Sequence, residues 1–275
     1  MRLKLSISTC PNDTFMFEAI NNKRIDTLNY DFDIILADID VLNKMTIDNN
    51  SDISKISFNN YPFITTNYQL LRSGAAIGFG NGPLIISKHK IEPKDLQYSK
   101  IAIPGENTTA NLLLKKLFPE ITLKKVYLFS DIERAILEQE VDAGLIIHET
   151  RFTYKKLGLQ MIVDLGQEWE KQTGLPLPLG GIVIKRNLPD KIKTDIQYII
   201  QQSVEYAINN PQKSISFIKK HSQNISDHVI KQHIKLYVNK KSIKIDKESE
   251  NAIKELLSLS AYFNNTTLQN PVFID

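Results

Sequence analysis

The sequence has a single cysteine and no long apolar run. With Cys10 alone, an internal disulfide is excluded, and so low a cysteine content is typical of a reducing compartment. No stretch approaches the roughly 18 consecutive apolar residues that a membrane-spanning helix needs. The first residues alternate between polar and apolar and then reach Pro11, so they lack the apolar region of a secretory signal. We therefore expect a cytoplasmic protein without a membrane partner.

The charged residues show no strong excess of one sign. The chain has 34 Lys and Arg against 31 Asp and Glu, a net charge of +3, and its basic residues are scattered. Nucleic-acid-binding domains concentrate such residues on one face, so we expect no nucleic-acid partner. With 42% apolar residues, the 275 residues can bury a sizeable core as one large domain or as two domains of ordinary size.

The sequence motifs of several large enzyme classes are missing. There is no Gly-x-Gly-x-x-Gly, no P-loop motif and no Gly-x-Ser-x-Gly elbow, so dinucleotide, P-loop and serine-hydrolase chemistry have no support. The segment beginning at His148 superficially resembles a zinc-binding helix, but Phe152 stands where the second histidine is required, and we expect no metal. The remaining histidines lie in Lys- or Ser-rich patterns typical of solvated surface: His89, His221, His228 and His233.

Short apolar runs alternate with helical patterns along most of the chain. This alternation predicts an α/β fold with a largely parallel sheet. The expected strands are 2–8, 30–37, 53–58, 100–103, 126–129, 143–147 and 161–165. The expected helices are 13–22, 39–45, 61–71, 109–117 and 132–140, followed by an almost wholly helical tail over 189–262.

Two glycine-bearing apolar runs, 74–87 and 177–184, interrupt this alternation. We interpret them as two crossings between two lobes, which gives a first lobe of 1–85 plus 185–275 and a second lobe of 86–184. The ligand would then lie in the cleft between the lobes. One continuous doubly wound sheet is the alternative, and the chain length leaves it open.

His148 ends an apolar run that is typical of a buried strand. In open α/β sheets, ligands bind beyond the carboxyl ends of the strands, where a histidine can take and return a proton. The structural alternative is a half-buried histidine that donates a hydrogen bond to a backbone carbonyl.

Two loops place polar residues before a helix. In the first, Asn12 or Asp13 is expected to cap the helix. In the second, Gly105 forms a turn and Thr108 or Thr109 starts the helix. Free N–H groups at such ends attract a carboxylate or phosphate, whereas ordinary capping is the simpler interpretation.

Two further segments carry polar or glycine residues with open roles. Lys55 lies near the end of a strand, and three roles are open for it: anion partner, Schiff-base amine or plain structural support. We favour the anion or support role. Gly180 and Gly181 indicate either close approach of the backbone to a ligand or a hinge. Trp169 has three interpretations: it stacks on a ligand, it covers the edge of the cleft, or it packs in the core.

Six motifs occur in one order along about two-thirds of the chain. They are Ser-x-Cys-Pro-Asn-Asp-Thr-Phe, Asp-x-x-Lys-Ile-Ser, Gly-x-Gly-x-Gly-Pro, Pro-Gly-x-x-Thr-Thr-Ala, Gly-Leu-Ile-Ile-His-Glu and Pro-Leu-Gly-Gly-Ile. Together they resemble the 1,4-dihydroxy-6-naphthoate synthases of the futalosine route to menaquinone. Thr9, where the family pattern has proline, is a mild departure.

The resemblance implies a two-lobed, periplasmic-binding-protein-like fold, in which each lobe has a mixed, mostly parallel sheet flanked by helices. It implies a lyase that converts cyclic dehypoxanthinylfutalosine, a small carboxylated substrate, to dihydroxynaphthoate without redox cofactor or metal. His148 would be the general base. The residues that would bind the substrate are Asn12, Lys55, Ser57, Asn59, Thr108, Thr109 and Ala110. The oligomeric state is left open between monomer and homodimer.

Other functions of the same fold remain as alternatives. A solute-binding protein of a transporter would share the fold, but such proteins are exported, and this chain shows no signal sequence or lipoprotein cysteine. A chorismate dehydratase-like enzyme of the same pathway would take a different carboxylated substrate, and the Cys-Pro-Asn-Asp-Thr motif with His148 favours the synthase. A regulatory ligand-binding domain would normally carry a DNA-reading helix pair, and we find none in the sequence.

Overall fold

The computed structural model describes residues 1–222 and 226–274, which form two compact units. Unit 1 consists of Met1–Ile77 and Pro178–Asp275, and unit 2 of Gly78–Leu177. The chain passes between the units in β5 (Ala76–Gly78) and β11 (Leu177–Lys185), which pair with each other. These boundaries fall several residues before the predicted lobe boundaries, and the lobe assignment stays a prediction.

The sheet of unit 1 has the strand order β2–β1–β3–β11–β4, with β5 pairing with β11. β1 pairs in parallel with β2 and β3, whereas β11 runs antiparallel to β3 and β4. The strand bounds not yet given are β1 (Arg2–Ser8), β2 (Asp31–Ala37), β3 (Ile53–Ser57) and β4 (Tyr68–Leu70).

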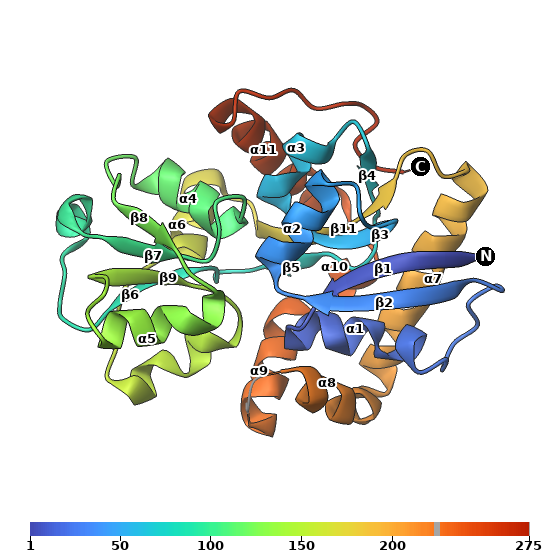
Figure 1. Ribbon diagram of the computed structural model, residues 1–275, viewed down its shortest axis with the longest axis horizontal. Coiled ribbons are helices and arrows are strands. Elements are labelled where there is room, and N and C mark those ends of the chain that lie inside the picture. Colours follow the sequence, from blue (N-terminus) through green and yellow to red (C-terminus); the bar gives the residue numbers. More distant parts are fainter. Residues whose placement is uncertain (223–225, 275) are drawn as a thin grey trace. The chain divides into compact units, whose positions relative to one another are not determined.

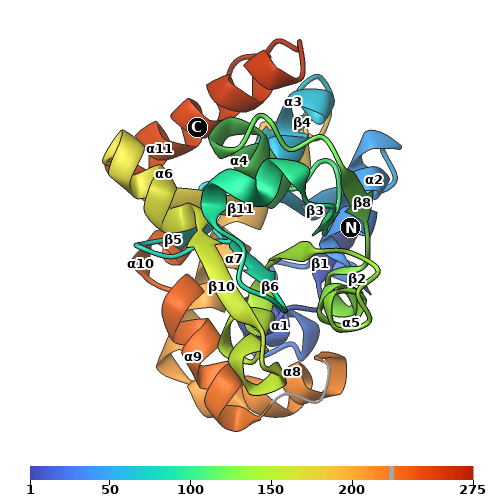
Figure 2. The same cartoon turned by 90° about the vertical axis from the view of Figure 1, so that its left-hand side faces the viewer.

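Helices cover both faces of this sheet. Figures 1 and 2 show α2, α3 and α11 on one side and α1, α8 and α9 on the other, and α1 also packs against α7. The core between β1, α1 and α7 buries aliphatic and aromatic side chains such as Leu5, Phe17 and Ile199. The helices are α1 (Pro11–Asn21), α2 (Ile39–Ile47), α3 (Tyr61–Ile64), α7 (Asp190–Asn209), α8 (Ile215–His221), α9 (Asp227–Tyr237), α10 (Lys240–Ile243) and α11 (Lys247–Phe263).

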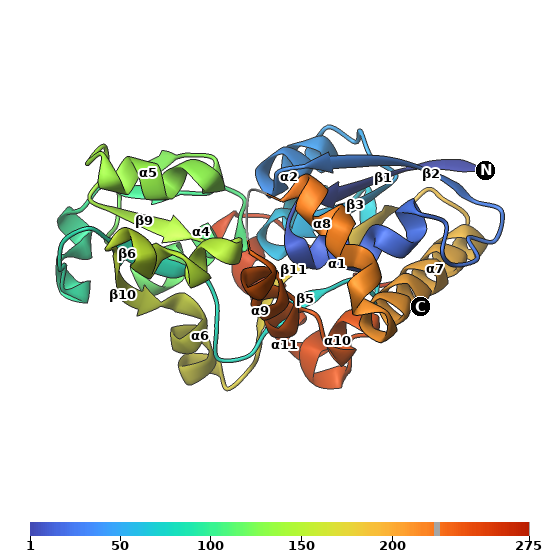
Figure 3. The same cartoon turned by 90° about the horizontal axis from the view of Figure 1, so that it is seen from below.

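The sheet of unit 2 has the strand order β10–β6–β9–β7–β8. β7 is parallel to β8 and β9, and β6 is antiparallel to β9 and β10. Figure 3 shows α5 and α6 on opposite sides of this sheet. The elements are β6 (Leu84–Ser87), β7 (Ile101–Ile103), α4 (Thr109–Leu117), β8 (Lys124–Val126), α5 (Ile132–Leu137), β9 (Ala143–Ile146), β10 (Gln160–Asp164) and α6 (Leu165–Thr173).

The α/β fold with mixed sheets is as expected, but some predicted elements were wrong. The helix predicted over 61–71 ends at Ile64, because the following residues form β4, which pairs with β11. The strand predicted over 126–129 stops at Val126 and gives way to a 3-10 turn, Phe129–Asp131. Helix α6 was not predicted, although Asp164 caps it through the backbone N–H of Gly166.

Candidate functional site

The parallel strands β7, β8 and β9 end at one edge of the unit 2 sheet. Because β9 and β8 flank β7, the segments that follow the three strands begin side by side. These segments contain Thr108 after β7, Phe129 after β8 and His148 after β9. This edge therefore gathers the polar and aromatic residues that the sequence placed at separate strand ends.

His148 lies in an unusual backbone conformation at this edge. Its φ is 60°, in the left-handed region that few residues other than glycine adopt. The half-buried imidazole meets the ring of Phe129 edge to face, with ring centroids 4.8 Å apart and planes at 74°. A strained backbone conformation persists only where the surroundings enforce it, and such positions cluster at functional sites.

The N-terminus of α4 lies beside His148 along the sheet edge. Thr108 is the N-cap, and its hydroxyl accepts a hydrogen bond from the backbone N–H of Asn111 at 3.3 Å and donates to the carbonyl of Gly105 at 2.8 Å. Gly105 has a φ of 145°, which makes glycine the residue that fits this turn. Thr109 and Ala110 are buried in the first helical turn, whose N–H groups favour an anion.

Arg151 supports the turn that carries His148. Its Nη2 donates to Asp164 Oδ2 at 2.7 Å, and its Nη1 donates to the carbonyl oxygen of Gly82. Asp164 is buried and also accepts hydrogen bonds from the backbone N–H groups of Gly166 and Gln167. The arginine thereby ties the His148 turn to the N-terminus of α6.

Two carboxyl groups, one buried and one half-buried, lie next to this turn. Glu149 directly follows His148, and Glu133 lies on α5. Burial and the negative charge of Glu149 raise the pKa of Glu133 to about 7, although Thr153 stabilises its ionised form. Burial also raises the pKa of Glu149. Among the described residues, Glu133 Oε1 and Glu149 Oε2 are buried without a hydrogen-bond partner, which agrees with the raised pKa of each group.

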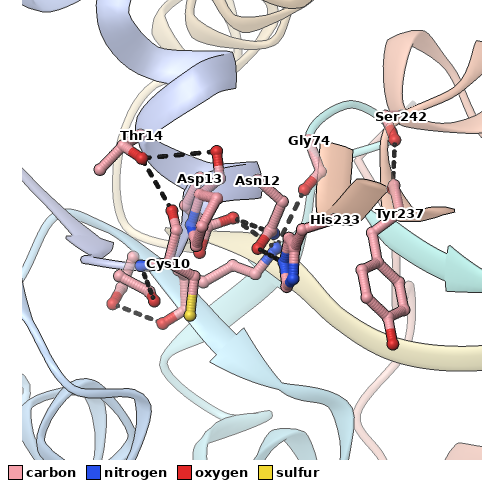
Figure 4. Close-up of polar contacts among 12 residues, drawn as sticks. Cys10, Asn12, Asp13, Thr14, Gly74, His233, Tyr237 and Ser242 are labelled. Carbon is pink, nitrogen blue, oxygen red and sulfur yellow. Dashed lines mark hydrogen bonds and ion pairs between the residues drawn. The ribbon is translucent and has the colours of Figure 1, made fainter. Parts of the chain in front are cut away.

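In unit 1, Asn12, Asp13 and Lys55 form one buried network (Figure 4). Lys55 Nζ lies 3.0 Å from Asp13 Oδ1 and donates to the carbonyl of Gly74 at 3.3 Å. Asn12 Nδ2 donates to the same Asp13 oxygen at 2.9 Å. Burial raises the pKa of Asp13, and the ammonium of Lys55 opposes that rise. The Lys55 charge is therefore already balanced inside the protein.

The predicted caps of the first helix were wrong. α1 begins at Pro11 with Cys10 as N-cap, so Asn12 and Asp13 lie inside the first turn. Proline fits the first helical position because its missing N–H would have no helical partner there. The side chains of Asn12 and Asp13 are thus available for the network with Lys55.

His233 was predicted to be a solvated surface residue, and this was wrong. It lies on α9 with only 1% of its surface exposed, and its Nε2 is 3.1 Å from Asn12 Oδ1. Its ring also packs against Tyr237, one turn further along the helix. The local Lys-rich pattern describes the outer face of α9 and not the face that packs against α1.

Ser57 ends β3 and Asn59 lies in the turn that follows, and both are buried. The backbone N–H of Ser57 donates to Asn43 Oδ1 at 3.0 Å. Asn59 Oδ1 accepts from the Ser260 hydroxyl at 2.7 Å and from Asn264 Nδ2 at 3.3 Å, which ties this turn to α11. The amide oxygen of Asn59 therefore holds the C-terminal helix.

The glycine pair in β11 is explained by strand packing. A Cβ on Gly180 would lie 2.6 Å from the carbonyl oxygen of Ile56 on β3, and a Cβ on Gly181 would lie 2.9 Å from the Phe58 ring. Trp169 is 1% exposed and donates to the carbonyl of Pro176, so of its three interpretations the structure favours packing.

Residues 1–222 and 226–274 contain neither a candidate metal cluster nor a candidate membrane-spanning helix. No group of three or more His, Cys, Asp or Glu side chains there is suited to hold a metal ion. No helix in that part of the chain is both long enough and apolar enough to cross a membrane.

The fold defines the class of protein. The chain resembles the alkanesulfonate-binding protein SsuA from Xanthomonas axonopodis pv. citri, with a TM-score of 0.72 over 99% of this chain and 96% of that one. The sequence identity is 13%, so this likeness shows a periplasmic-binding-protein fold alone.

The sequence places the chain within one family of this class. It belongs to the menaquinone biosynthesis family, whose sequence profile matches residues 3–262. A Thermus thermophilus protein named 1,4-dihydroxy-6-naphtoate synthase is 36% identical over 93% of both chains. The protein of that name from Streptomyces coelicolor is 36% identical over 94% of this chain and 93% of its own. A crystal structure of an Archaeoglobus fulgidus protein, 32% identical, has a TM-score of 0.90 over 96% of this chain and 98% of that one.

Proposed function

We propose that this protein is a carbon–carbon lyase of menaquinone biosynthesis that converts cyclic dehypoxanthinylfutalosine to 1,4-dihydroxy-6-naphthoate. Membership of the menaquinone biosynthesis family and the name of the two relatives support this activity. The observation that carries it is His148, held in a strained conformation at the carboxyl end of β9 beside the N-terminus of α4. We also propose that it acts in the cytoplasm.

In this proposal His148 is the general base. Its imidazole removes a proton that the neighbouring ketone of the substrate makes acidic. The carbon–carbon bond to the sugar then breaks, and the ring becomes aromatic, which drives the reaction. A positioned general base typically contributes about 10²–10⁴-fold to the rate. The edge contact with Phe129 supports this role, because it restricts the imidazole to one orientation.

The N-terminus of α4 is the proposed site for the substrate carboxylate or sugar hydroxyls. Thr108, Thr109 and Ala110 contribute a hydroxyl-rich first turn and free backbone N–H groups. The last turn carries Lys115 and Lys116, whose positive charges stabilise the opposite end of the helix dipole.

The proposed group of polar substrate-binding residues in unit 1 consists of Asn12, Ser57 and Asn59. Lys55 belongs to it through Asp13 and not as a free cation, because the two charges are 3.0 Å apart and both side chains are buried. Of its predicted roles, the support role is therefore favoured over the anion role.

The test is turnover of authentic cyclic dehypoxanthinylfutalosine by the purified protein, with the naphthoate product followed by liquid chromatography and mass spectrometry. We expect product formation without added metal or redox cofactor. Conversion of chorismate in place of this substrate would assign the chain to the dehydratase alternative. Tight binding of a solute without turnover of either compound would instead make it a binding protein of the same fold.

A further inference from the structure

The hydrogen-bond donors and acceptors of the buried network in unit 1 can be assigned one after another, starting from Lys55. An ammonium group can only donate hydrogen bonds, so Asp13 Oδ1, 3.0 Å away, is the acceptor. That oxygen also lies 2.9 Å from the amide group of Asn12, whose nitrogen must therefore face it, because two facing oxygens would repel. The orientation of the Asn12 amide is thus set from one side by a charged pair.

His233 sets the same orientation from the other side. Once Asn12 Nδ2 faces Asp13, the amide oxygen faces His233 Nε2, 3.1 Å away. A carbonyl oxygen accepts and never donates, so Nε2 must carry a proton. Figure 4 shows the imidazole of His233 facing Asn12, with Asp13 on the far side of the amide.

Burial makes this arrangement costly to break. Asp13 and His233 are each 1% exposed and Lys55 is 4% exposed, so an amide flipped by half a turn would leave a buried donor facing a donor and an acceptor facing an acceptor. Asn12 retains 6% exposure, the largest of the four side chains in this network. The second N–H of its amide then points away from Asp13 Oδ1.

We infer that His233 is a positioning residue that holds the Asn12 amide with its nitrogen available as a hydrogen-bond donor to an oxygen of the substrate. The part of this inference that concerns the substrate rests on the proposed function. The arrangement of donors and acceptors in the network does not. Helix α9 thereby acts on the first turn of α1, 221 positions away in sequence. The motifs that first identified the family resemblance do not include this helix.

The first measurement needs no substrate. Long-range ¹⁵N–¹H correlation spectra of the histidine rings, with His233 assigned by its loss in the His233→Gln variant, report which ring nitrogen is protonated. We expect a proton on Nε2. An unprotonated Nε2 with a proton on Nδ1 alone would overturn the inference, whatever the enzyme turns over.

The second measurement separates positioning from mere support. His233→Leu removes the donor and should raise KM about tenfold while kcat changes less than about twofold. His233→Gln keeps an N–H donor on a shorter, uncharged side chain and should restore KM to within about threefold of wild type. The control is His228→Leu on the exposed side of α9, which should leave both constants unchanged.

Each outcome of this comparison is informative. An unchanged KM in His233→Leu, or a KM that His233→Gln fails to restore although that variant is folded, contradicts the positioning role. If His233→Leu does not fold, the comparison of His233→Gln with His233→Asn, whose amide is too short to reach Asn12, replaces it. If the wild type converts no substrate, the proposed function fails while the ¹⁵N measurement still decides the state of the network.

Discussion

The side chains of Asn12 and His233 meet at 3.1 Å although 221 positions separate them in sequence. Asn12 lies in the first turn of α1, and His233 lies on the face of α9 that packs against that helix. Lys55 and Asp13 continue this contact on the other side of the amide. The first turn of α1 is therefore held by contacts with two other, distant parts of the chain.

Lys55→Met should destabilise the protein by about 3–5 kcal/mol at neutral pH, because it leaves the Asp13 carboxylate buried without its cation. The loss should shrink at lower pH, since a protonated Asp13 needs no counter-charge. The double variant Lys55→Met/Asp13→Asn should recover part of the loss. Urea unfolding measures the loss at neutral pH, the loss at lower pH and the recovery in the double variant. The control is Lys44→Met, which removes an exposed partner of Asp40 and should cost about 0–1 kcal/mol.

Glu133 should make the stability fall as the pH rises from about 4.5 to about 7. Its pKa is about 7 in the folded protein, against an ordinary value of 4.5. In this window the folded state therefore binds more protons than the unfolded state, so the free energy of unfolding decreases as pH rises. After allowance for partial exposure, the change is on the order of 1 kcal/mol.

Glu133→Gln should remove this part of the pH dependence. The measurement is the free energy of unfolding of the variant and the wild type at matched pH values across the window. The exposed Glu120→Gln serves as the control and should follow the wild type. A Glu133→Gln curve parallel to the wild-type curve would show that the raised pKa does not act on stability.

Arg151→Met should destabilise unit 2 by about 3–5 kcal/mol, because it leaves the buried Asp164 carboxylate without its cation. The matched control is Arg134→Met, whose ion pair with Glu138 is about half exposed, and which should cost about 0–1 kcal/mol. Equal midpoints of denaturation for the two variants would contradict the supporting role of Arg151.

The backbone of His148 predicts an unusual order of stability among its variants. Glycine normally makes a protein less stable than alanine does, through the entropy of the unfolded chain. At a φ of 60°, alanine instead incurs a steric cost of about 1–2 kcal/mol that glycine avoids. His148→Gly should therefore unfold at a higher denaturant concentration than His148→Ala, and the reverse order would argue against a strained position.

The sequence correctly predicted the elements whose bounds are set by a local residue pattern. The strand Arg2–Ser8 and the helix Thr109–Leu117 have the predicted bounds, because alternation and capping act over a few residues. The position of His148 just after a buried strand was predicted in the same way, from an apolar run that ends in one polar residue, and its catalytic role stays a prediction. These signals need no knowledge of what packs against them.

The predictions from sequence were wrong where contacts with a distant part of the chain determine the structure. β4 replaced a predicted helix because Leu70 pairs with Val183 and with Phe273, near the end of the chain. His233 was predicted to lie on the surface because no residue near it in sequence indicates that Asn12 is its partner. A helical projection of α9 that placed His233 beside Val229 and Ile230 would have indicated its buried face.

The turnover number of His148→Ala tests the central claim most directly. Compared with wild type on cyclic dehypoxanthinylfutalosine, we expect kcat to fall by about 10²–10⁴-fold while the substrate affinity, measured by calorimetry, changes only a few-fold. The exposed His89→Ala is the control in the same unit and should retain wild-type kcat. A folded His148→Ala variant with near-wild-type kcat would contradict the assignment of His148 as the general base.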